Sequence, residues 1–386
     1  MDLAVTGNNK MGQDCKPVPI LQLVNGEFFS GAERVQVVIG KNLDRDKYSL
    51  HFVSLLNGIF IDQARKMKLD VTLIPMKGKL DLSVLPRLSK FIRGKNIKLV
   101  HTHTVRTNLV GRIIGHWLKI PVITHIHSPN WQESTSRLSN TLNDWLDMKM
   151  ARYTTHFIAV NNALREHYVR RKVPSERISV IYNAIDIDYF LNSPKQNISE
   201  RKDLVFGFIA LFRPRKGTDI FLHAIRKLSS MDSFNNHVKF LMIGGFESES
   251  YEGKIRDLAC RLQIGDMIEF CGFCPDMDKM IQSIDVLVLP SLFGEGTPMV
   301  IMEAMAAGKP VIATRIEGVE EMIEHGVDGL LVPPEDDQSL AEAFITLCQD
   351  QKKAQQMGRC GRIKAEQRYN AKYMISQLEE IYASIL

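Results

Sequence analysis

The chain has 386 residues, of which 45% are hydrophobic and 24% are charged, and its formal net charge is +5. This length exceeds what one ordinary core supports and predicts two domains, with the composition of a soluble globular protein. Every apolar run is shorter than the roughly 20 residues of a membrane span, and the N-terminus lacks the charged-then-apolar order of a signal peptide. We therefore expect a cytoplasmic protein.

Short apolar runs alternate with longer segments of helical period, a pattern typical of βα units and parallel sheets. In the first half, strands are expected over residues 18–24, 48–56, 71–76, 97–103, 121–127, 156–160 and 178–182. In the second half, they are expected over residues 204–211, 238–244, 267–273, 285–290, 310–314 and 329–334. The sequence therefore predicts an α/β protein with two doubly wound, Rossmann-like parallel sheets that face a cleft.

The composition changes along the chain set the expected domain boundaries. A polar stretch between the two sets of strands predicts a linker, and an amphipathic segment closes the chain. We expect a leader over 1–17, an N-terminal domain over 18–190, a linker over 191–203, a C-terminal domain over 204–365 and a helix over 366–386 that packs back toward the N-terminal domain.

The segment over residues 290–314 is nearly all apolar, yet it carries Glu295 and Glu303. A carboxylate inside an apolar helix is costly unless a partner hydrogen-bonds to it. Thr297 is expected to cap this helix, and Pro298 suits its first turn. The helix N-terminus would open at the cleft and bind an anion. A ligand with phosphate there and hydroxyls beside both acids has the layout of a nucleotide-sugar.

A second candidate element follows the first strand of the second domain. It carries Arg213 and Lys216 at the carboxyl end of that strand. A guanidinium fork and an ammonium suit the oxygens of a diphosphate, whereas the alternative is a surface turn with two solvated bases.

These segments resemble the retaining GT-B glycosyltransferases of family 4 (glycosyl transferases group 1). The pair Glu295 and Glu303 is similar to the E-x7-E motif of that family. The resemblance covers about residues 18–386, and its motifs lie at residues 30–35, 123–130, 157–190, 212–217, 295–336 and 378–382.

The resemblance implies that the domain over 18–190 binds the acceptor and the domain over 204–365 binds the nucleotide-sugar. It also implies a role for each matching residue. Glu303 would bind the ribose, and Glu295 would face the donor sugar, while Arg213 and Lys216 would neutralise the departing diphosphate. The sugar and phosphate would also contact the backbone of Gly296, Thr297, Pro298, Met299 and Val300. The base would lie beside Cys271, Gly272, Phe273 and Cys274.

Two N-terminal residues complete the implied site. Gly31 would let the backbone approach the phosphates closely, and His127 would reach the sugar near the reacting carbon. Residues 127–140, with a tryptophan, are a candidate wall of the acceptor site. Ser30 replaces the first glycine of the family's loop, and Ala184 departs from its interdomain pattern.

The implied reaction is retaining transfer of a hexose from a nucleoside-diphosphate sugar to a hydroxyl of a glycan or lipid-linked acceptor, in surface polysaccharide or glycolipid synthesis. UDP-sugar is the first expectation and GDP-sugar the second. No metal or other cofactor is expected, because Arg213, Lys216 and a helix end supply the positive field. Thr297 stands where the family often has an aromatic residue, so the sugar is left open, as are the acceptor, the linkage and the oligomeric state.

Two alternatives remain at this point. One is a non-catalytic nucleotide-sugar-binding protein, which loss of charge at Glu303, Arg213 or Lys216 would favour. The other is a sugar-nucleotide epimerase of the same fold, which would change the sugar without releasing nucleotide.

Several other patterns carry a weaker functional interpretation. The C-x-x-C spacing at Cys271 and Cys274 is interpreted as a strand end, because no second cysteine pair would complete a zinc site. The D-x-D at 186–188 lies in the interdomain passage and is not expected to bind metal. Histidines at 101, 103, 125 and 127 are expected to be strand-end residues, with a shared zinc site as the alternative.

The remaining charge gathers in the first half of the chain. Residues 87–98 and 168–172 are basic, which is typical of solvated helix faces. The sharper hypothesis is peripheral attraction to the anionic inner face of a membrane or to a phosphorylated acceptor. No nucleic acid is expected, because no recognised binding motif accompanies the charge.

Overall fold

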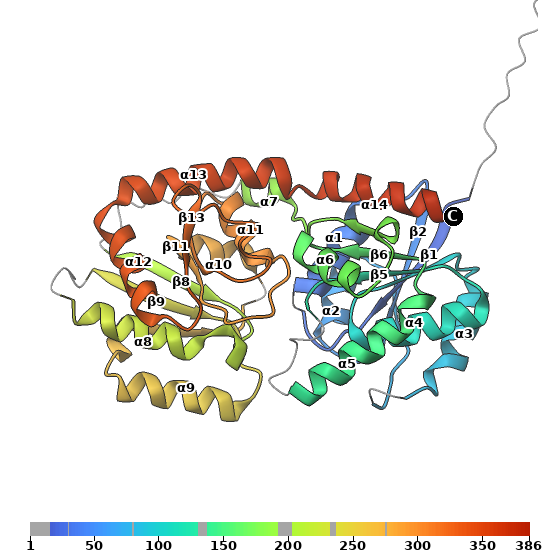
Figure 1. Ribbon diagram of the computed structural model, residues 1–386, viewed down its shortest axis with the longest axis horizontal. Coiled ribbons are helices and arrows are strands. Elements are labelled where there is room, and N and C mark those ends of the chain that lie inside the picture. Colours follow the sequence, from blue (N-terminus) through green and yellow to red (C-terminus); the bar gives the residue numbers. More distant parts are fainter. Residues whose placement is uncertain are drawn as a thin grey trace, which may run out of the picture.

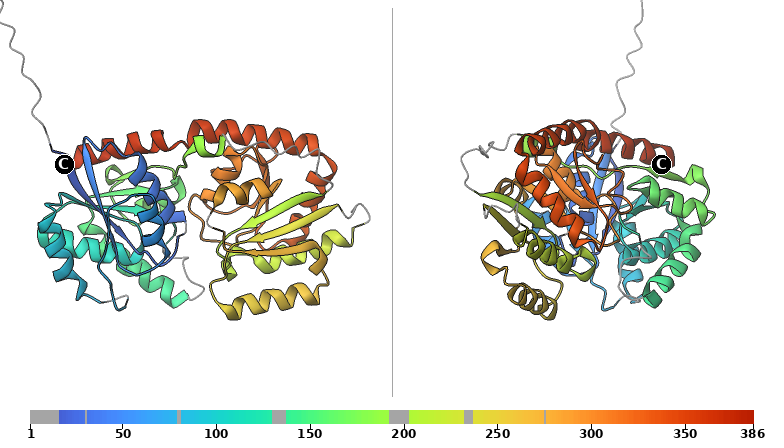
Figure 2. Two further views of the ribbon diagram at one scale, coloured as in Figure 1. Left: turned by 180° about the vertical axis from the view of Figure 1, so that it is seen from behind. Right: turned by 60° about the vertical axis from the view of Figure 1, so that its left-hand side comes forward.

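A computed structural model describes residues 16–29, 31–78, 81–129, 137–191, 203–231, 237–274 and 276–386. These residues form two lobes, each built around a parallel sheet, and two C-terminal helices run along one side of both lobes (Figures 1 and 2). The predicted fold class, two Rossmann-like parallel-sheet domains, is confirmed.

The N-terminal sheet has seven parallel strands in the order β3-β2-β1-β4-β5-β6-β7. The strands are β1 (Val18–Val24), β2 (Tyr48–Ser54), β3 (Val71–Leu73), β4 (Leu99–Thr102), β5 (Val122–Ile126), β6 (His156–Ala159) and β7 (Ile178–Val180). Most of their apolar side chains are fully buried, because helices cover both faces of a doubly wound sheet.

The C-terminal sheet has six parallel strands in the order β10-β9-β8-β11-β12-β13. The strands are β8 (Leu204–Ile209), β9 (Val238–Ile243), β10 (Ile268–Gly272), β11 (Val286–Leu289), β12 (Val311–Thr314) and β13 (Gly329–Val332). Each strand begins within one residue of a segment expected from the apolar runs.

Helices join the strands in both lobes. Those of the N-terminal lobe are α1 (Gly31–Asn42), α2 (Ile59–Lys66), α3 (Val84–Gly94), α4 (Val105–Leu118), α5 (Arg137–Met150) and α6 (Asn162–Arg170), whereas α7 (Ile187–Leu191) packs against the C-terminal lobe (Figure 1). Those that follow are α8 (Thr218–Ser229), α9 (Glu249–Arg261), α10 (Met277–Ser283), α11 (Met299–Ala306), α12 (Asp337–Gln349), α13 (Gln351–Arg368) and α14 (Ala371–Ile385).

The last two helices connect the lobes. Figure 1 shows α13 over the C-terminal lobe and α14 over the N-terminal lobe, and α14 contacts α1. The chain crosses between lobes at two points that meet, because Ile185 N donates to the carbonyl oxygen of Tyr369 and Ala371 N donates to that of Ile185, both at 3.0 Å. Leu378 and Tyr382 of α14 are buried in the core.

Successive strands are added on one side of β1 and then, from β4 on, on its other side, so the strand order reverses between β1 and β4. The strand order of the other sheet reverses in the same way between β8 and β11. In open α/β sheets, ligands bind outside the carboxyl ends of the strands at such points. Gly31 lies beyond β1, Arg213 and Lys216 lie beyond β8, and Glu295 lies beyond β11. The fold therefore brings the predicted donor residues to the two switch points.

One local prediction is wrong. Thr297 does not cap α11, because its Oγ1 donates a hydrogen bond to the carbonyl oxygen of Val160 in the other lobe, at 2.6 Å. Pro298 is the capping residue instead, without a side-chain hydrogen bond. Four predicted features fall partly or wholly outside the described residues, namely residues 1–15 of the expected leader, Ser30, most of the expected linker (192–202) and residues 130–136 of the acceptor wall.

Candidate active site

Glu295 lies in the loop between β11 and α11 and is 7% exposed. Its carboxylate pairs with the ammonium of Lys216, accepts a hydrogen bond from the Ser291 hydroxyl at 2.7 Å, and lies 3.7 Å from Nη1 of Arg215. Burial alone would raise the pKa of Glu295, but the two cations outweigh it and lower the pKa to about 2. Glu295 is therefore a carboxylate at every physiological pH.

Glu303 is the fifth residue of α11 and is fully buried. Its partner is the guanidinium of Arg34, which comes from α1 of the other lobe and also donates from Nη1 to Oε2 at 3.2 Å. Burial lowers the pKa of Arg34 to about 10, which still leaves it charged at neutral pH. The buried carboxylate of Glu303, which the sequence predicts to be costly without a partner, is thus paired with a cation from the other lobe.

The basic turn after β8 has three members with different environments. Lys216 faces Glu295, and burial lowers the pKa of Lys216 despite that partner. Arg213 lies over the ring of Phe28 at 5.6 Å, and its Nε is 3.5 Å from Glu247. Arg215 donates to the carbonyl oxygen of Gly294 at 3.0 Å. The turn therefore concentrates three positive charges beside the loop that precedes α11.

The loop before α11 is also where the two lobes touch. A Cβ at Gly296 would overlap the carbonyl oxygen of His127, so only glycine permits this approach. The Asn161 amide donates to the carbonyl oxygen of Gly296, and the Asn183 amide donates to that of Thr297, both at 3.1 Å. The start of α11, with its free backbone N–H groups, is thereby fixed against the end of β5.

His127 follows β5 and contacts His103, with 2.9 Å between His127 Nε2 and His103 Nδ1. Burial lowers the pKa of His127 to about 4, so the ring is neutral at pH 7. Gly31 is the first residue of α1, and open space surrounds the position of its missing Cβ.

The region expected beside the base lies at the end of β10. Gly272 has a φ of +69° and accepts a hydrogen bond from Gly244 N at 2.8 Å, while Phe273 is 56% exposed. Cys271 and Cys274 are both free thiols. Burial raises the pKa of Cys271, the reverse of what a reactive thiolate needs. This environment fits a strand end and not a redox motif.

The structure brings together Glu295, Lys216, His127 and the start of α11, and it places Glu303 beside Arg34. Sequence reasoning missed four polar residues that shape this region, namely Arg34, Arg215, Asn161 and Asn183. Asp186 and Asp188 are exposed at the start of α7.

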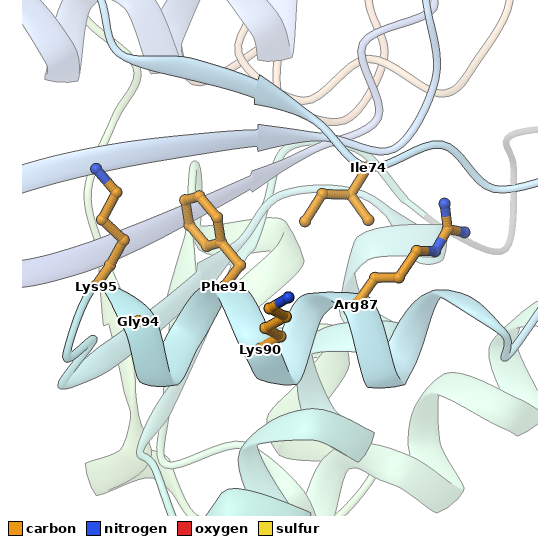
Figure 3. Close-up of a pocket in the computed structure, with 6 residues that line it drawn as sticks. All are labelled: Ile74, Arg87, Lys90, Phe91, Gly94 and Lys95. Carbon is orange, nitrogen blue, oxygen red and sulfur yellow. The ribbon is translucent and has the colours of Figure 1, made fainter.

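A pocket of about 450 Å³ lies elsewhere, on α3 (Figure 3). None of the residues of the candidate active site lines it. Its lining is Ile74, Arg87, Lys90, Phe91, Gly94 and Lys95.

Comparisons with known proteins agree with this architecture. Residues 29–189 match the family described as Glycosyltransferase Family 4, and residues 190–364 match the family described as Glycosyl transferases group 1. The chain therefore belongs to the family 4 glycosyltransferases, and its fold is GT-B.

Individual relatives have low sequence identity, but each match spans most of both chains. The chain is 26% identical to the UDP-Gal:alpha-D-GlcNAc-diphosphoundecaprenol alpha-1,3-galactosyltransferase of Escherichia coli, over 79% of this chain and 80% of that protein. It is 24% identical to the N-acetyl-alpha-D-glucosaminyl L-malate synthase of Bacillus anthracis, over 98% and 97% of the two chains. The structure of Anabaena Alr3699/HepE in complex with UDP-glucose matches with a TM-score of 0.84 at 24% identity, over 95% of this chain and 99% of that chain.

Proposed function

We propose that this glycosyltransferase moves a hexose from a UDP-sugar to a hydroxyl of a glycan or lipid-linked acceptor, with retention of configuration and without a metal ion. The observation that carries the proposal is the arrangement of Glu295, Glu303 and Lys216 around the start of α11, at the carboxyl edge of the sheet. GDP-sugar is the second choice of donor.

The relatives support the choice of donor and the kind of acceptor. The similar E. coli protein is named as a UDP-Gal-dependent enzyme that acts on a diphosphoundecaprenol-linked sugar, and other relatives are named for colanic acid and amylovoran biosynthesis. The Anabaena protein of the same fold holds UDP-glucose. A role in surface polysaccharide or glycolipid synthesis is consistent with these names.

In this proposal, the diphosphate lies between the start of α11 and the basic turn after β8. At about 4 Å and an effective dielectric near 20, each charge contact contributes roughly 4 kcal/mol before desolvation. Lys216 and Arg213, together with the backbone N–H groups, would stabilise the charge that develops on the leaving diphosphate. Positive groups of the protein thus take the role that a metal ion has in other transferases.

The way Glu295 is held supports the front-face mechanism of this proposal. Its carboxylate is engaged by Lys216, Arg215 and Ser291, so it is oriented as an electrostatic group and not as a free nucleophile. The leaving phosphate oxygen would then take the proton of the acceptor hydroxyl on the same face of the sugar. His127 would contact the sugar from the N-terminal lobe, and Glu303 would bind the ribose hydroxyls.

The acceptor would approach from the N-terminal lobe, and α3 supplies a surface for an anionic membrane. Arg87, Lys90, Arg93 and Lys95 are exposed on or next to this helix, and Phe91 lies among them (Figure 3). Among the described residues, no helix is both long and apolar enough to span a bilayer. In this proposal the attachment is peripheral and contributes about 1 kcal/mol per basic residue near the surface.

The donor is tested with a panel of UDP-, GDP-, ADP- and dTDP-sugars and excess chelator, by slow release of nucleoside diphosphate. Release from UDP-sugar alone that persists with chelator supports the proposal. Loss of release with chelator contradicts metal independence, and an altered sugar without free nucleotide points to an epimerase.

Membrane attachment is tested by sedimentation with vesicles that contain phosphatidylglycerol. The substitutions Arg87→Gln and Lys90→Gln together should weaken binding, whereas Arg256→Gln and Lys254→Gln on α9 serve as the matched control. Equal binding of both variants would contradict a role for α3.

A further inference from the structure

Four histidines form a stack beneath the candidate active site. His101 and His103 come from β4 and the residue after it, and His125 and His127 come from β5 and the residue after it. Residues two apart in a strand share a face, and these adjacent strands are in register, so the four rings meet. Ring centroids of neighbours lie 4.2–5.4 Å apart. Only His127 has partial exposure.

A chain of hydrogen bonds runs through this stack from the C-terminal helix. The Tyr382 hydroxyl of α14 lies 2.7 Å from His101 Nδ1 and 3.0 Å from Nε2 of Gln22 on β1. The other end of the Gln22 amide, Oε1, lies 2.7 Å from His103 Nε2. His103 Nδ1 then lies 2.9 Å from His127 Nε2.

The imidazole rings are neutral, and this limits where the protons lie along the row of hydrogen bonds. Burial lowers the pKa of His101 to about 3 and that of His127 to about 4, and it lowers that of His103 well below its usual value. A neutral imidazole has one N–H donor and one lone pair. Tyr382 keeps its proton, because burial raises its pKa.

The position of the proton in each hydrogen bond then determines its position in the next one. Gln22 Oε1 only accepts, so His103 must carry its proton on Nε2 and present a lone pair at Nδ1. His127 must therefore donate from Nε2, which leaves its Nδ1 as the lone pair. Among the described residues, the buried His127 Nδ1 has no partner at good hydrogen-bond geometry, and the side chain of Asn183 lies beside the His127 ring.

A metal ion explains the cluster less well. The candidate ligand atoms of His101, His103 and His125 do lie within 4.8 Å of one another. However, the planes of neighbouring rings in the stack are inclined by only 5–34°, so their in-plane lone pairs run side by side and do not converge on one point. Both nitrogens of His103 are also already hydrogen-bonded.

We propose that Tyr382 and Gln22 are positioning residues that hold His127 in the Nε2–H tautomer, so that its Nδ1 accepts a hydrogen bond from a hydroxyl of the bound substrate. Tyr382 acts by orienting the Gln22 amide, which in turn selects the tautomer of His103 and then of His127. The last helix of the chain thereby sets the hydrogen-bonding character of a residue at the junction of the lobes. The part that concerns substrate rests on the proposed function.

The tautomer is read directly by long-range 1H–15N correlation spectra of protein labelled with 15N-histidine. The His127→Gln variant identifies the signals of His127. We expect wild-type His127 to show a protonated Nε2 and an unprotonated Nδ1. In Tyr382→Phe and in Gln22→Met, both nitrogens should move toward averaged shifts, because the Gln22 amide is then free to turn or is absent.

The matched control is Tyr369→Phe, since Tyr369 is also fully buried but its hydroxyl has no partner among the described residues. This variant should leave the His127 signals unchanged, so folding defects are separated from loss of the hydrogen bond. A protonated Nδ1 in the wild type, or unchanged His127 signals in both Tyr382→Phe and Gln22→Met, would overturn the proposal. Signals that shift on addition of Zn²⁺ alone would show a metal site and would also overturn it.

Activity provides a second readout. Tyr382→Phe should lower kcat by about three- to tenfold with the donor KM within about twofold, since one hydrogen bond to the transition state is weakened. If His127→Gln has wild-type kinetics, the proposed role of His127 in transfer fails while the tautomer result still stands.

Discussion

Arg34 and Glu303 form an ion pair between the two lobes, and Glu303 is fully buried. Removing one partner of a buried pair leaves an uncompensated charge, which typically costs 3–5 kcal/mol. We expect Arg34→Met to lower the free energy of unfolding by about this amount. Chemical denaturation of the two proteins measures the difference.

A donor nucleotide should partly reverse this loss, because ribose hydroxyls can hydrogen-bond to the unpaired Glu303 carboxylate. The rise in Tm on addition of UDP should therefore be larger in Arg34→Met than in the wild type. Arg315→Met is the control, since its pair with Glu320 is half-exposed at 3.5 Å. A UDP-induced shift that is smaller in Arg34→Met would show that Arg34 itself binds the nucleotide.

Lys216→Met should lower kcat by about 10²–10³, which is the usual effect of removing one preorganised group that stabilises developing charge. It should also leave Glu295 with only Arg215 and Ser291 as polar partners. Steady-state release of nucleoside diphosphate measures the change. Lys227→Met, which breaks the more exposed pair with Asp337, should keep wild-type kcat. Wild-type kcat in Lys216→Met would refute the diphosphate role.

Gly296→Ala should separate the lobes, because the added methyl group would overlap the His127 carbonyl oxygen. We expect lower kcat and higher donor KM with each domain still folded, and a larger radius of gyration by small-angle scattering. Gly245→Ala is the matched control, since nothing lies within 4 Å of its Cβ position. An unchanged radius and unchanged kinetics in Gly296→Ala would mean that the lobes do not meet there in solution.

The histidine stack predicts a loss of stability in mild acid. Burial lowers the pKa of all four rings, so between pH 6.5 and about 4 the unfolded chain binds protons that the folded chain does not. Stability is therefore complete above pH 6.5 and falls as pH drops, by up to about 1.4 kcal/mol per pH unit for each ring.

His125→Phe tests this directly, because both nitrogens of His125 lack partners among the described residues and a phenyl ring cannot be protonated. The loss of stability between pH 7 and pH 5 should be smaller than in the wild type, because one buried ring that takes up a proton on unfolding is removed. His237→Gln, at a site whose side chain is 54% exposed, should keep the wild-type dependence. Equal acid sensitivity of all three proteins would contradict buried neutral rings.

The strands could be predicted from sequence because each is a short apolar run bounded by polar residues, as at Val286–Leu289. The two glutamates could be found for the opposite reason, since Glu295 and Glu303 interrupt an apolar segment. Both signals are local in the sequence, so they can be recognised without knowledge of the tertiary structure.

The residues that were missed depend on contacts between distant segments. Arg34 meets Glu303 across 269 positions, and Gln22 meets Tyr382 across 360. Thr297 was predicted to be a helix cap because its residue type and position suit one. Its hydroxyl instead donates a hydrogen bond to a carbonyl oxygen of the other lobe. Nothing in the local sequence marks such partners.

The most direct test of the central claim is calorimetric binding of UDP to the wild type and to Glu303→Ala in the presence of chelator. The account predicts binding to the wild type that chelator does not weaken, and a loss of at least about tenfold in affinity in Glu303→Ala, since a buried pair of ribose hydroxyls would lose its charged partner. Equal affinity of the two proteins for UDP would contradict the placement of the donor at α11.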